Sequence, residues 1–378
     1  MLSDLISIEL AVDIILWIYA VTLFIQLIYY LGIYSRLVFF RISDTKNEKP
    51  PVSVIICSRN EAHNLQRYLP SVLTQEYPEY EVIVVNDSST DDTGDILEKM
   101  SKEYPRLRYT TIPYEERFRH NKKLAVTVGI KAARHEHLLF TDADCYAESK
   151  DWISSMCRNF DDKTDIILGY GGYTAEKGLL NKFIRFDTLF IALQYFSYAL
   201  AGSPYMGVGR NLAYKKSLFF QNKGFASHSH IVSGDDDLFI NEVGTKRNTR
   251  IEVSKQSHTR SEPEKTIRAW VIKKRRHLTT GVRYKFVHKI LLSGEPATRI
   301  FFYISFVLLL IFNVYPEYIG GAFLLRLIVQ IIILKITINR LCEKYLLLYS
   351  LPFDIVMPFF NIGLTIANYI ISRRERWN

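Results

Sequence analysis

The chain has 378 residues, a formal net charge of +9 and an isoelectric point near 9.1. Its basic residues gather beside apolar stretches, around residues 36–41, 273–276 and 373–376, which favours an anionic membrane surface over a nucleic-acid partner. The four cysteines form no C-x-x-C pair, so neither a disulfide framework nor a structural zinc site is indicated, and we expect reduced thiols in a cytosolic domain.

The first apolar run covers residues 14–34. It contains no charged residue and is long enough to cross a bilayer as one helix. A signal peptide is the competing interpretation, but acidic residues at positions 4–13 stand where such a peptide would be basic. Arg36 and Arg41 follow the run. Because positive flanks stay in the cytosol, we expect an inner or plasma membrane protein with its amino terminus outside and the next domain inside.

The middle of the chain, residues 50–285, alternates short β-branched runs with helical stretches. This order is typical of βαβ units around a parallel sheet. Strands are expected at 52–58, 81–86, 108–112 and 137–141. Helices are expected at 60–75, 91–103 and 121–134, the first two capped by Asn60 and Thr90. Ligands of such sheets bind at the carboxyl ends of the strands, where most polar clusters of this region fall.

Asp142 and Asp144 directly follow the expected strand at 137–141. Two carboxylates two residues apart at a strand end can reach one divalent ion. Oxygen ligands suit Mg²⁺ or Mn²⁺, which would bridge to a diphosphate. An isolated D-x-D also occurs in ordinary turns, so the position after a buried strand is what supports a metal site here.

Other polar residues could line a nucleotide pocket at the same sheet edge. Asp87 ends the second strand, where its carboxylate could bind a base or ribose, with an Asx turn or helix cap as the alternative. Arg59, Asn60 and Glu61 could line this pocket as well as cap a helix. Lys122 opens the third helix and could reach a phosphate; otherwise it is a solvated lysine.

Asp235, Asp236 and Asp237 form a second acidic cluster. Adjacent carboxylates repel, so at least one is expected to have a raised pKa or a cationic partner, which favours a general base. The alternative is a helix start, where acids complement the helix dipole. One aspartate could act as base while another lies at the helix end, and we expect Asp237 to contact the substrate.

A glycine-rich segment, residues 202–211, precedes this cluster. It lacks the strand–loop–helix order of a dinucleotide fingerprint. We expect it to let the backbone approach a sugar, with Gly209 and Asn211 at the substrate.

A basic and aromatic segment, residues 270–284, follows the acidic cluster. On a helix, Lys273 shares one face with Arg276 and His277. These side chains could bind lipid head groups or neutralise a departing diphosphate, and the two roles are compatible.

The carboxyl-terminal region, residues 296–378, is again apolar. Residues 300–315 and 319–338 are predicted to cross the membrane outward and back. A further crossing by residues 346–371 would leave the arginines after it outside, against the charge rule. Pro352 and Pro358 interrupt this segment, so a re-entrant or interfacial hairpin is the preferred interpretation.

Together these motifs resemble the family 2 glycosyltransferases, in the membrane-embedded branch that includes polysaccharide synthases and lipid glycosyltransferases. Residues 52–61 look like the opening strand and nucleotide loop, and VVNDSSTDDT at 84–93 looks like the segment whose aspartate, here Asp87, contacts the nucleoside. Lys122 resembles the lysine of the helix before the metal motif, and Asp142-Ala-Asp144 matches that motif. The resemblance implies an α/β GT-A nucleotide-diphospho-sugar transferase domain at 50–285, inserted between a transmembrane helix in 1–42 and transmembrane or interfacial helices in 296–378.

Two departures from the family pattern affect the predicted roles. The usual Glu-Asp, followed by Asp-Leu, has Gly234 in place of the glutamate, which implies Asp235 as the base and Asp236 as its rival. The Q-x-x-R-W motif of processive synthases is altered as well. Its three positions hold Lys273, Arg276 and His277. Without the tryptophan an acceptor sugar loses a stacking surface, so transfer of one or a few sugars is favoured over processive synthesis.

The resulting hypothesis is an inverting glycosyltransferase that uses a nucleotide-sugar, most commonly a UDP-sugar, and a lipid or membrane-associated glycan acceptor. A divalent metal would offset the diphosphate charge, while Asp235 takes the acceptor proton. A nucleotidyltransferase, which would release pyrophosphate, is one alternative. The other is a catalytically silent membrane subunit that binds a nucleotide-sugar or a glycan.

Overall fold

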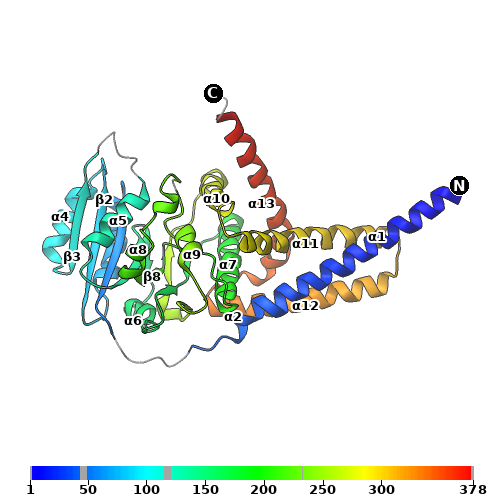
Figure 1. Ribbon diagram of the computed structural model, residues 1–378, viewed down its shortest axis with the longest axis horizontal. Helices are drawn as coiled ribbons and strands as arrows, with labels where there is room; N and C mark the ends of the chain where they lie inside the picture. The colour runs from blue at the N-terminus through cyan, green and yellow to red at the C-terminus, as the bar shows by residue number, and fades with distance from the viewer. Residues whose placement is uncertain (1, 43–48, 115–120, 232, 376–378) are drawn as a thin grey trace. The chain divides into compact units, whose positions relative to one another are not determined.

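The computed structural model describes residues 2–42, 49–114, 121–231 and 233–375 (Figure 1). The chain divides into two compact units. An α/β unit contains Arg41–Tyr284 and Arg340–Cys342, and a helical unit contains the apolar segments on either side.

The α/β unit is built on a seven-stranded sheet with the order β3-β2-β1-β4-β8-β6-β9. Its strands are β1 (Val52–Ser58), β2 (Tyr80–Asp87), β3 (Leu107–Ile112), β4 (His137–Asp142), β6 (Ile166–Leu168), β8 (Leu212–Lys215) and β9 (Thr249–Ile251). The strands β1 to β4 are mutually parallel, which confirms the four predicted strands, whereas β8 runs antiparallel to β4. The almost continuous burial of β1 and β2 explains their apolar runs, because both faces of the sheet are covered.

Helices cover both faces of this sheet. The helices α3 (Ala62–Leu73), α4 (Thr93–Glu103) and α6 (Trp152–Cys157) share one hydrophobic core with the even-numbered residues of β1. The helix α5 (Lys122–Ala132) packs on the opposite face. There a Cβ on Gly129 would lie 2.6 Å from Ile55 Cγ2, so a glycine permits this close approach of α5 to the sheet.

The α/β unit also contains a small second sheet and further helices. A small second sheet has the order β5-β10-β7 and is formed by β5 (Cys145–Ala147), β7 (Gly171–Tyr173) and β10 (Thr259–Ser261). The remaining helices are α7 (Leu179–Leu200), α8 (Lys216–Gln221), η2 (Ala226–His228), α9 (Asp237–Val243), η3 (Lys255–Ser257) and α10 (Ile267–Gly281). Because β5 begins directly after Asp144, the small sheet starts at the predicted metal motif.

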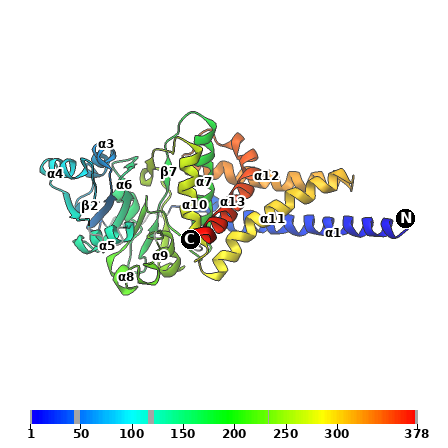
Figure 2. The same ribbon diagram turned by 90° about the horizontal axis from the view of Figure 1, so that it is seen from above.

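The helical unit starts with α1 (Leu2–Leu27), which continues as a π-helix, η1 (Ile28–Tyr34), and as α2 (Ser35–Phe39). It is completed by α11 (Phe286–Ile311), α12 (Pro316–Arg340) and α13 (Leu347–Glu375). Among the described residues, four helices are long and apolar enough to span a membrane. They cover Glu9–Phe39, Phe286–Ile311, Pro316–Arg340 and Leu347–Asn368. Figures 1 and 2 show α1, α11 and α12 extending to the same side of this unit, with α13 inclined to them.

Two predictions for this unit need correction. The membrane crossing predicted at residues 300–315 corresponds to a helix that begins earlier, at Phe286, and ends at Ile311. The hairpin predicted around Pro352 and Pro358 is instead a single helix that contains both prolines. Asp354, which lies between them, is fully buried and bound to other helices, so tertiary contacts hold the backbone helical despite two prolines.

The contacts of Asp354 belong to a buried charged group that we call the bundle cluster: Glu295, Arg299, Tyr303, Arg326 and Asp354. Arg299 donates to Asp354 Oδ1 at 2.6 Å and to Glu295 Oε2 at 2.7 Å. Arg326 lies 3.3 Å from Asp354 Oδ2, which also accepts from the Tyr303 hydroxyl at 2.7 Å. Buried charges in an apolar helix bundle require such partners, so these contacts account for the charged residues of α11, α12 and α13 that lie inside the unit.

Candidate active site

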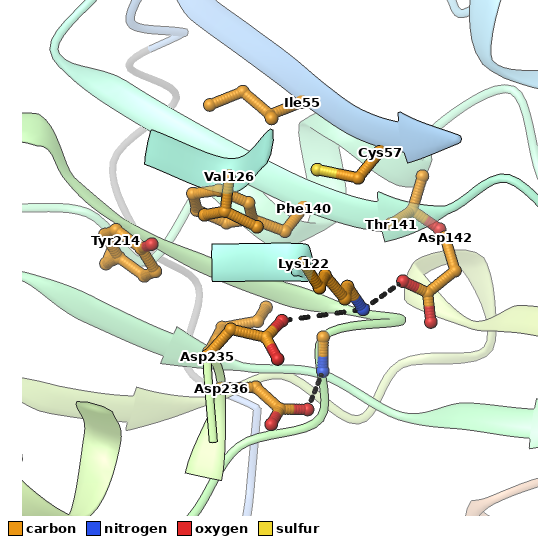
Figure 3. A pocket seen from close by; sticks show the side chains of 12 residues that line it. Ile55, Cys57, Lys122, Val126, Phe140, Thr141, Asp142, Tyr214, Asp235 and Asp236 are labelled. Carbon is orange, nitrogen blue, oxygen red and sulfur yellow. Dashed lines mark hydrogen bonds and ion pairs between the residues drawn. The ribbon is translucent and has the colours of Figure 1, made fainter. Parts of the chain in front are cut away.

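Three predicted residues meet beyond the ends of β1 and β4 (Figure 3). The Lys122 ammonium lies 2.6 Å from Asp142 Oδ1 and 3.5 Å from Asp235 Oδ2. Lys122 is the first residue of α5, whose start is set by Asn121, because the Asn121 side chain accepts a hydrogen bond from the Leu124 amide. Lys122 therefore stands between a carboxylate at the end of β4 and one from the second acidic cluster.

The charges of this group shift one another's pKa values. Burial disfavours the ammonium of Lys122, but Asp142 and Asp235 beside it raise its pKa well above the ordinary value. Burial also disfavours ionised Asp142, yet Lys122 holds the pKa of that carboxyl below its ordinary value. For Asp235 the balance is reversed. Burial, together with repulsion from Asp236 and Asp142, outweighs Lys122 and raises the pKa of Asp235.

These charged residues line a small pocket, which explains why burial affects their pKa values (Figure 3). Asp142, Asp235 and Asp236 line it together with Lys122, and the other lining residues are mostly apolar. They include Ile55, Val126, Phe140, Leu212 and Tyr214. An apolar lining lowers the local dielectric, which favours the protonated form of Asp235 and makes Asp235 a more basic carboxylate than Asp142.

The neighbouring Asp236, the predicted rival base, is engaged by the backbone. Its Oδ2 accepts from the Gly209 amide at 2.7 Å, and its Oδ1 accepts from the Asp237 amide at 2.7 Å, as the cap of α9. A Cβ on Gly209 would lie 3.3 Å from both Asp236 Oδ2 and Lys122 Nζ, so the glycine allows this approach. Asp236 thus holds the loop together, while Asp235, with 11% of its side chain exposed, is paired with a side chain.

The family glutamate that is missing at Gly234 would not fit this loop. Gly234 has φ +97°, and a Cβ there would lie 2.5 Å from Leu238 Cδ1. Both the left-handed backbone and the clash exclude a larger side chain at this position. The turn that this loop makes into α9 therefore depends on glycine at this position.

The acidic pair predicted to hold a metal lies at the turn from β4 into β5. Single ligand atoms of Asp142, Asp144 and Cys145 all lie within 4.8 Å of one another. Mg²⁺ and Mn²⁺ prefer oxygen ligands, so the Cys145 thiol, whose pKa burial raises well above its ordinary value, is a poor ligand for them. Two carboxylates remain. They fit Mg²⁺ or Mn²⁺, which are commonly held by one or two carboxylates together with substrate phosphates.

A third acid lies near this pair. Burial raises the pKa of Glu61, and repulsion from Asp144 and Asp142 adds to the effect. The Glu61 carboxylate accepts a hydrogen bond from the Asn64 amide group at 2.6 Å. The predicted nucleotide loop thus contributes a further negative group on the side of the metal motif, where a bound cation would relieve the repulsion.

Arg210 is a cation of this site that the sequence analysis missed. Its guanidinium lies 4.4 Å from the centre of the Tyr173 ring, and Lys273 lies 5.5 Å from the same ring. Burial opposes both charges, but Tyr173 and Asp144 raise the pKa values of both groups. Two cations therefore stand next to the acidic pair. An arginine inside the glycine-rich segment was the signal available in the sequence.

The other two residues of the altered basic motif lie differently. Lys273 is paired with Glu264 at 3.1 Å and faces Tyr173, whereas Arg276 and His277 are exposed on α10. Of the three positions, Lys273 is the one that the described contacts place beside the acidic pair.

The predicted nucleotide loop is shaped by contacts with the next loop. Asn60 has φ +56°, and its side chain accepts from the Thr90 amide at 2.8 Å. The helix caps were predicted wrongly, because Glu61 and Asp92 precede α3 and α4. Asp91 supplies the capping carboxylate to both helices, accepting from the amides of Ala62 and Thr93 at 3.1 Å each.

The residues around this loop differ in exposure. Asp87 is buried at the carboxyl end of β2, with 5% exposure, whereas the Arg59 side chain is exposed on the neighbouring loop. Both lie on the side of the sheet edge where a nucleotide was predicted, and their roles there remain predictions.

Asn211, predicted at the substrate, is fully buried instead. Its amide group donates to the carbonyls of Tyr170 at 2.9 Å and Ser257 at 2.7 Å, and its oxygen accepts from the Trp152 indole at 3.1 Å. These bonds connect the residue before β8 with α6, with η3 and with the segment between β6 and β7. The predicted substrate contact is therefore corrected to a structural role.

Several known proteins are similar to parts of this chain. Residues 53–219 match the model of Glycosyl transferase family 2. The poly-beta-1,6-N-acetyl-D-glucosamine synthase of Staphylococcus epidermidis is 34% identical over 93 residues, which are 25% of this chain and 21% of that protein. The beta-1,3-glucosyltransferase WfaP of Escherichia coli, named as acting on UDP-Glc and alpha-D-GlcNAc-diphosphoundecaprenol, is 28% identical over 129 residues, 33% of this chain and 47% of that one.

A solved structure shows the same fold. The mannosyltransferase PcManGT of Pyrobaculum calidifontis, in complex with GDP-Man and Mn²⁺, matches with a TM-score of 0.58 and 17% identity, over 88% of this chain and 99% of that one. The chain spans about a fifth to a half of the two curated relatives described above. The molecule is thus a GT-A-like α/β domain flanked by long apolar helices. Residues 53–219, somewhat less than half of the chain, are similar to family 2 of the glycosyltransferases.

Proposed function

We propose that this protein is an inverting glycosyltransferase that moves a sugar from a nucleoside-diphosphate donor to a hydroxyl group of a lipid or membrane-associated glycan. The observation that carries the proposal is the arrangement around Lys122. This lysine separates Asp142, whose pKa is lowered, from Asp235, whose pKa is raised. Two carboxylates driven toward opposite protonation behaviour suit two roles, one as metal ligand and one as base.

In the proposed reaction Asp235 takes the proton of the acceptor hydroxyl. The acceptor oxygen bonds to the anomeric carbon from one face, while the bond to the diphosphate oxygen breaks on the other, so the configuration is inverted. The nucleoside diphosphate leaves with the electron pair of that bond. Asp142 and Asp144 would hold Mg²⁺ or Mn²⁺, which offsets charge on the diphosphate. Arg210 and Lys273 would bind phosphate oxygens on the same side.

The donor is proposed to be a UDP-sugar, and UDP is the first probe to use. The named relatives support a sugar nucleotide in general, since WfaP is named for UDP-Glc and PcManGT was crystallised with GDP-Man. Asp87, Arg59 and Asn60 are proposed to line the nucleoside side of the pocket. GDP is the matched alternative probe.

The acceptor is proposed to be membrane-associated, because helices suited to a bilayer lie on both sides of the α/β domain in the sequence. The positive residues after the first span favour a cytosolic catalytic domain and an outside amino terminus. Transfer of one or a few sugars is favoured, because His277 replaces the tryptophan of processive synthases. A processive polymerase is the second candidate, and the named activity of the Staphylococcus epidermidis relative favours it.

A donor screen with membranes that contain the full chain tests this function. UDP- and GDP-sugars are supplied with Mn²⁺, and released nucleoside diphosphate and pyrophosphate are measured separately. The proposal predicts nucleoside diphosphate and a sugar-bearing lipid extract. Pyrophosphate alone would instead indicate a nucleotidyltransferase, and neither product from any donor would favour a silent subunit. The length of the attached glycan distinguishes single transfer from polymer synthesis.

A further inference from the structure

Asp237 is a buried acid of the catalytic loop that the proposed chemistry does not use. It opens α9, two residues after Asp235, and 7% of its surface is exposed. Its Oδ1 accepts a hydrogen bond from the Leu238 amide at 2.7 Å. Although Asp237 is predicted to contact the substrate, its remaining oxygen is directed to another helix.

That oxygen, Oδ2, is bound by two hydroxyl groups. Thr280 in the last turn of α10 donates to it, and Tyr284, just beyond that helix, donates to it at 2.8 Å. Both hydroxyls are buried with the carboxylate, and the Tyr284 ring packs against Tyr205 with 5.8 Å between the ring centres. Asp237 therefore ties the loop of the proposed base to the carboxyl-terminal end of α10.

The helix α10 is also held nearer its middle. Lys274 pairs with Asp187 of α7 at 2.6 Å, and both side chains are more than nine-tenths buried. The preceding residue, Lys273, lies over Tyr173 and pairs with Glu264. The same helix thus carries a proposed phosphate-binding cation near its middle and the contacts to Asp237 at its end.

We infer that Asp237 is a positioning residue that holds α10, and with it Lys273, in place relative to the proposed base Asp235. The inference rests on the proposed function. Three residues of one loop then have separate tasks: Asp235 faces Lys122, Asp236 binds the Gly209 amide, and Asp237 fastens α10. The base on one side of the donor and a cation on the diphosphate side are linked through one carboxylate.

Removing one hydroxyl from this link is the mildest test. Tyr284→Phe and Thr280→Val each delete one donor to Asp237, and Asp237→Ala deletes the acceptor. Full-length protein in membranes or detergent is used for all variants. We expect the dissociation constant of UDP with Mn²⁺ and the donor KM to rise about 3- to 10-fold in each single variant, within the range for coupled neighbours. In Asp237→Ala, adding Tyr284→Phe should cause little further change, because the link is already broken.

Tyr77→Phe is the matched control. The Tyr77 hydroxyl is a similar buried donor, to the Pro50 carbonyl at 2.7 Å, and it lies outside the segments that form the link to α10. If Asp237 were merely structural, Tyr284→Phe and Tyr77→Phe would both lower the active fraction, and so kcat, without changing the donor KM. A change in KM and in UDP affinity that is specific to Tyr284→Phe and Thr280→Val supports the positioning role.

Hydrogen exchange of α10 separates failure of this inference from failure of the proposed function. Faster exchange in α10 of Tyr284→Phe, together with wild-type UDP affinity and donor KM, would overturn the positioning role while leaving glycosyl transfer intact. Unchanged exchange in both hydroxyl variants would overturn the link itself. If the wild type releases no nucleoside diphosphate and binds neither UDP nor GDP, the proposed function fails, and the positioning role fails with it.

Discussion

The two units of this chain differ in the balance of their buried charges. In the bundle cluster of the helical unit, two arginines stand against two carboxylates, with Arg299 bridging Glu295 and Asp354. At the ends of the strands in the α/β unit, carboxylates are in excess. Lys122 is shared by Asp142 and Asp235, while Asp144, Asp236 and Glu61 lie close to them.

This difference indicates a structural role for the buried charges of the helical unit and a chemical role for those of the α/β unit. Opposite charges that pair inside an apolar bundle hold its helices together. An excess of acids at a sheet edge is unfavourable unless a cation binds or one acid stays protonated. The α/β unit offers both ways to relieve the repulsion. Asp142 and Asp144 form a candidate metal site, and Asp235 is an acid of raised pKa.

The largest expected effect concerns the candidate metal site of the α/β unit. Asp144→Asn removes one of two carboxylates while leaving the Lys122–Asp142 pair in place. We expect transfer to fall by about 10³-fold or more, comparable with the loss of a main electrostatic contributor to the transition state. Nucleoside-diphosphate release with and without added Mn²⁺ measures this. Chelation with EDTA should abolish wild-type activity, and restoration by Mn²⁺ but not by Ca²⁺ would support a small octahedral site. Undiminished activity in EDTA would contradict the metal assignment.

Breaking the charge balance of the bundle cluster is expected to destabilise the helical unit rather than to affect catalysis directly. Asp354→Leu leaves Arg299 and Arg326 without their shared carboxylate, which should destabilise the helical unit by about 3–5 kcal/mol. Thermal unfolding of the purified full chain in detergent measures this. Leu347→Ala, in the same helix, is the control. A wild-type melting temperature in Asp354→Leu would show that the cluster is dispensable.

Replacing the cation that the two acids share should move the pH dependence. Burial and like charges already raise the pKa of Asp235, so kcat/KM is expected to fall as pH drops below that raised value, where the base becomes protonated. Lys122→Met removes the ammonium that favours ionised Asp235, so the acid limb should move to higher pH. Activity at neutral pH should fall about 10-fold or more. A limb that stays in place, or moves to lower pH, would argue against Asp235 as the base.

The smallest effect concerns stability. Burial, with repulsion from Asp236, raises the pKa of Asp237 from 3.8 to about 7 in the folded state. The unfolded chain then releases this proton at lower pH than the folded chain does. The stabilising contribution is therefore fully present below pH 4 and is lost as pH rises toward 7. In Asp237→Asn this part of the pH dependence should disappear, as measured by denaturant unfolding at pH 5 and pH 7.5. An unchanged slope in that variant would refute the shift.

Much of the α/β unit was predictable because its strands are long and buried. The apolar runs at 52–58 and 137–141 are typical of strands that are buried on both faces of a parallel sheet. The strands of the small sheet have three residues each, too short for a periodic pattern, and their pairing depends on contacts distant in sequence. The single helix α13 was missed for a related reason, since Asp354 outweighs two prolines only through partners on other helices.

The site was predictable where spacing carried the chemistry, and less so where packing did. Asp142, Lys122 and Asp235 are brought together as expected, although their roles remain proposals. Asn211 has the same polar side chain whether it faces a sugar or the core, so its burial was invisible in the sequence. Arg210 could not be predicted for a different reason. It contacts the Tyr173 ring, and Tyr173 is positioned by the pairing of β7 with β10, two strands that are distant in the sequence.

The most direct test of the account compares Asp235→Asn with Asp236→Asn, measuring UDP·Mn²⁺ binding and nucleoside-diphosphate release on the same preparations. If Asp235 is the base, Asp235→Asn keeps a dissociation constant close to that of the wild type but loses transfer by about 10²- to 10⁴-fold. Asp236→Asn should disturb binding and transfer together, because it loosens the loop at Gly209. Full transfer by Asp235→Asn, with loss of transfer alone in Asp236→Asn, would contradict the account and assign the proton transfer to Asp236.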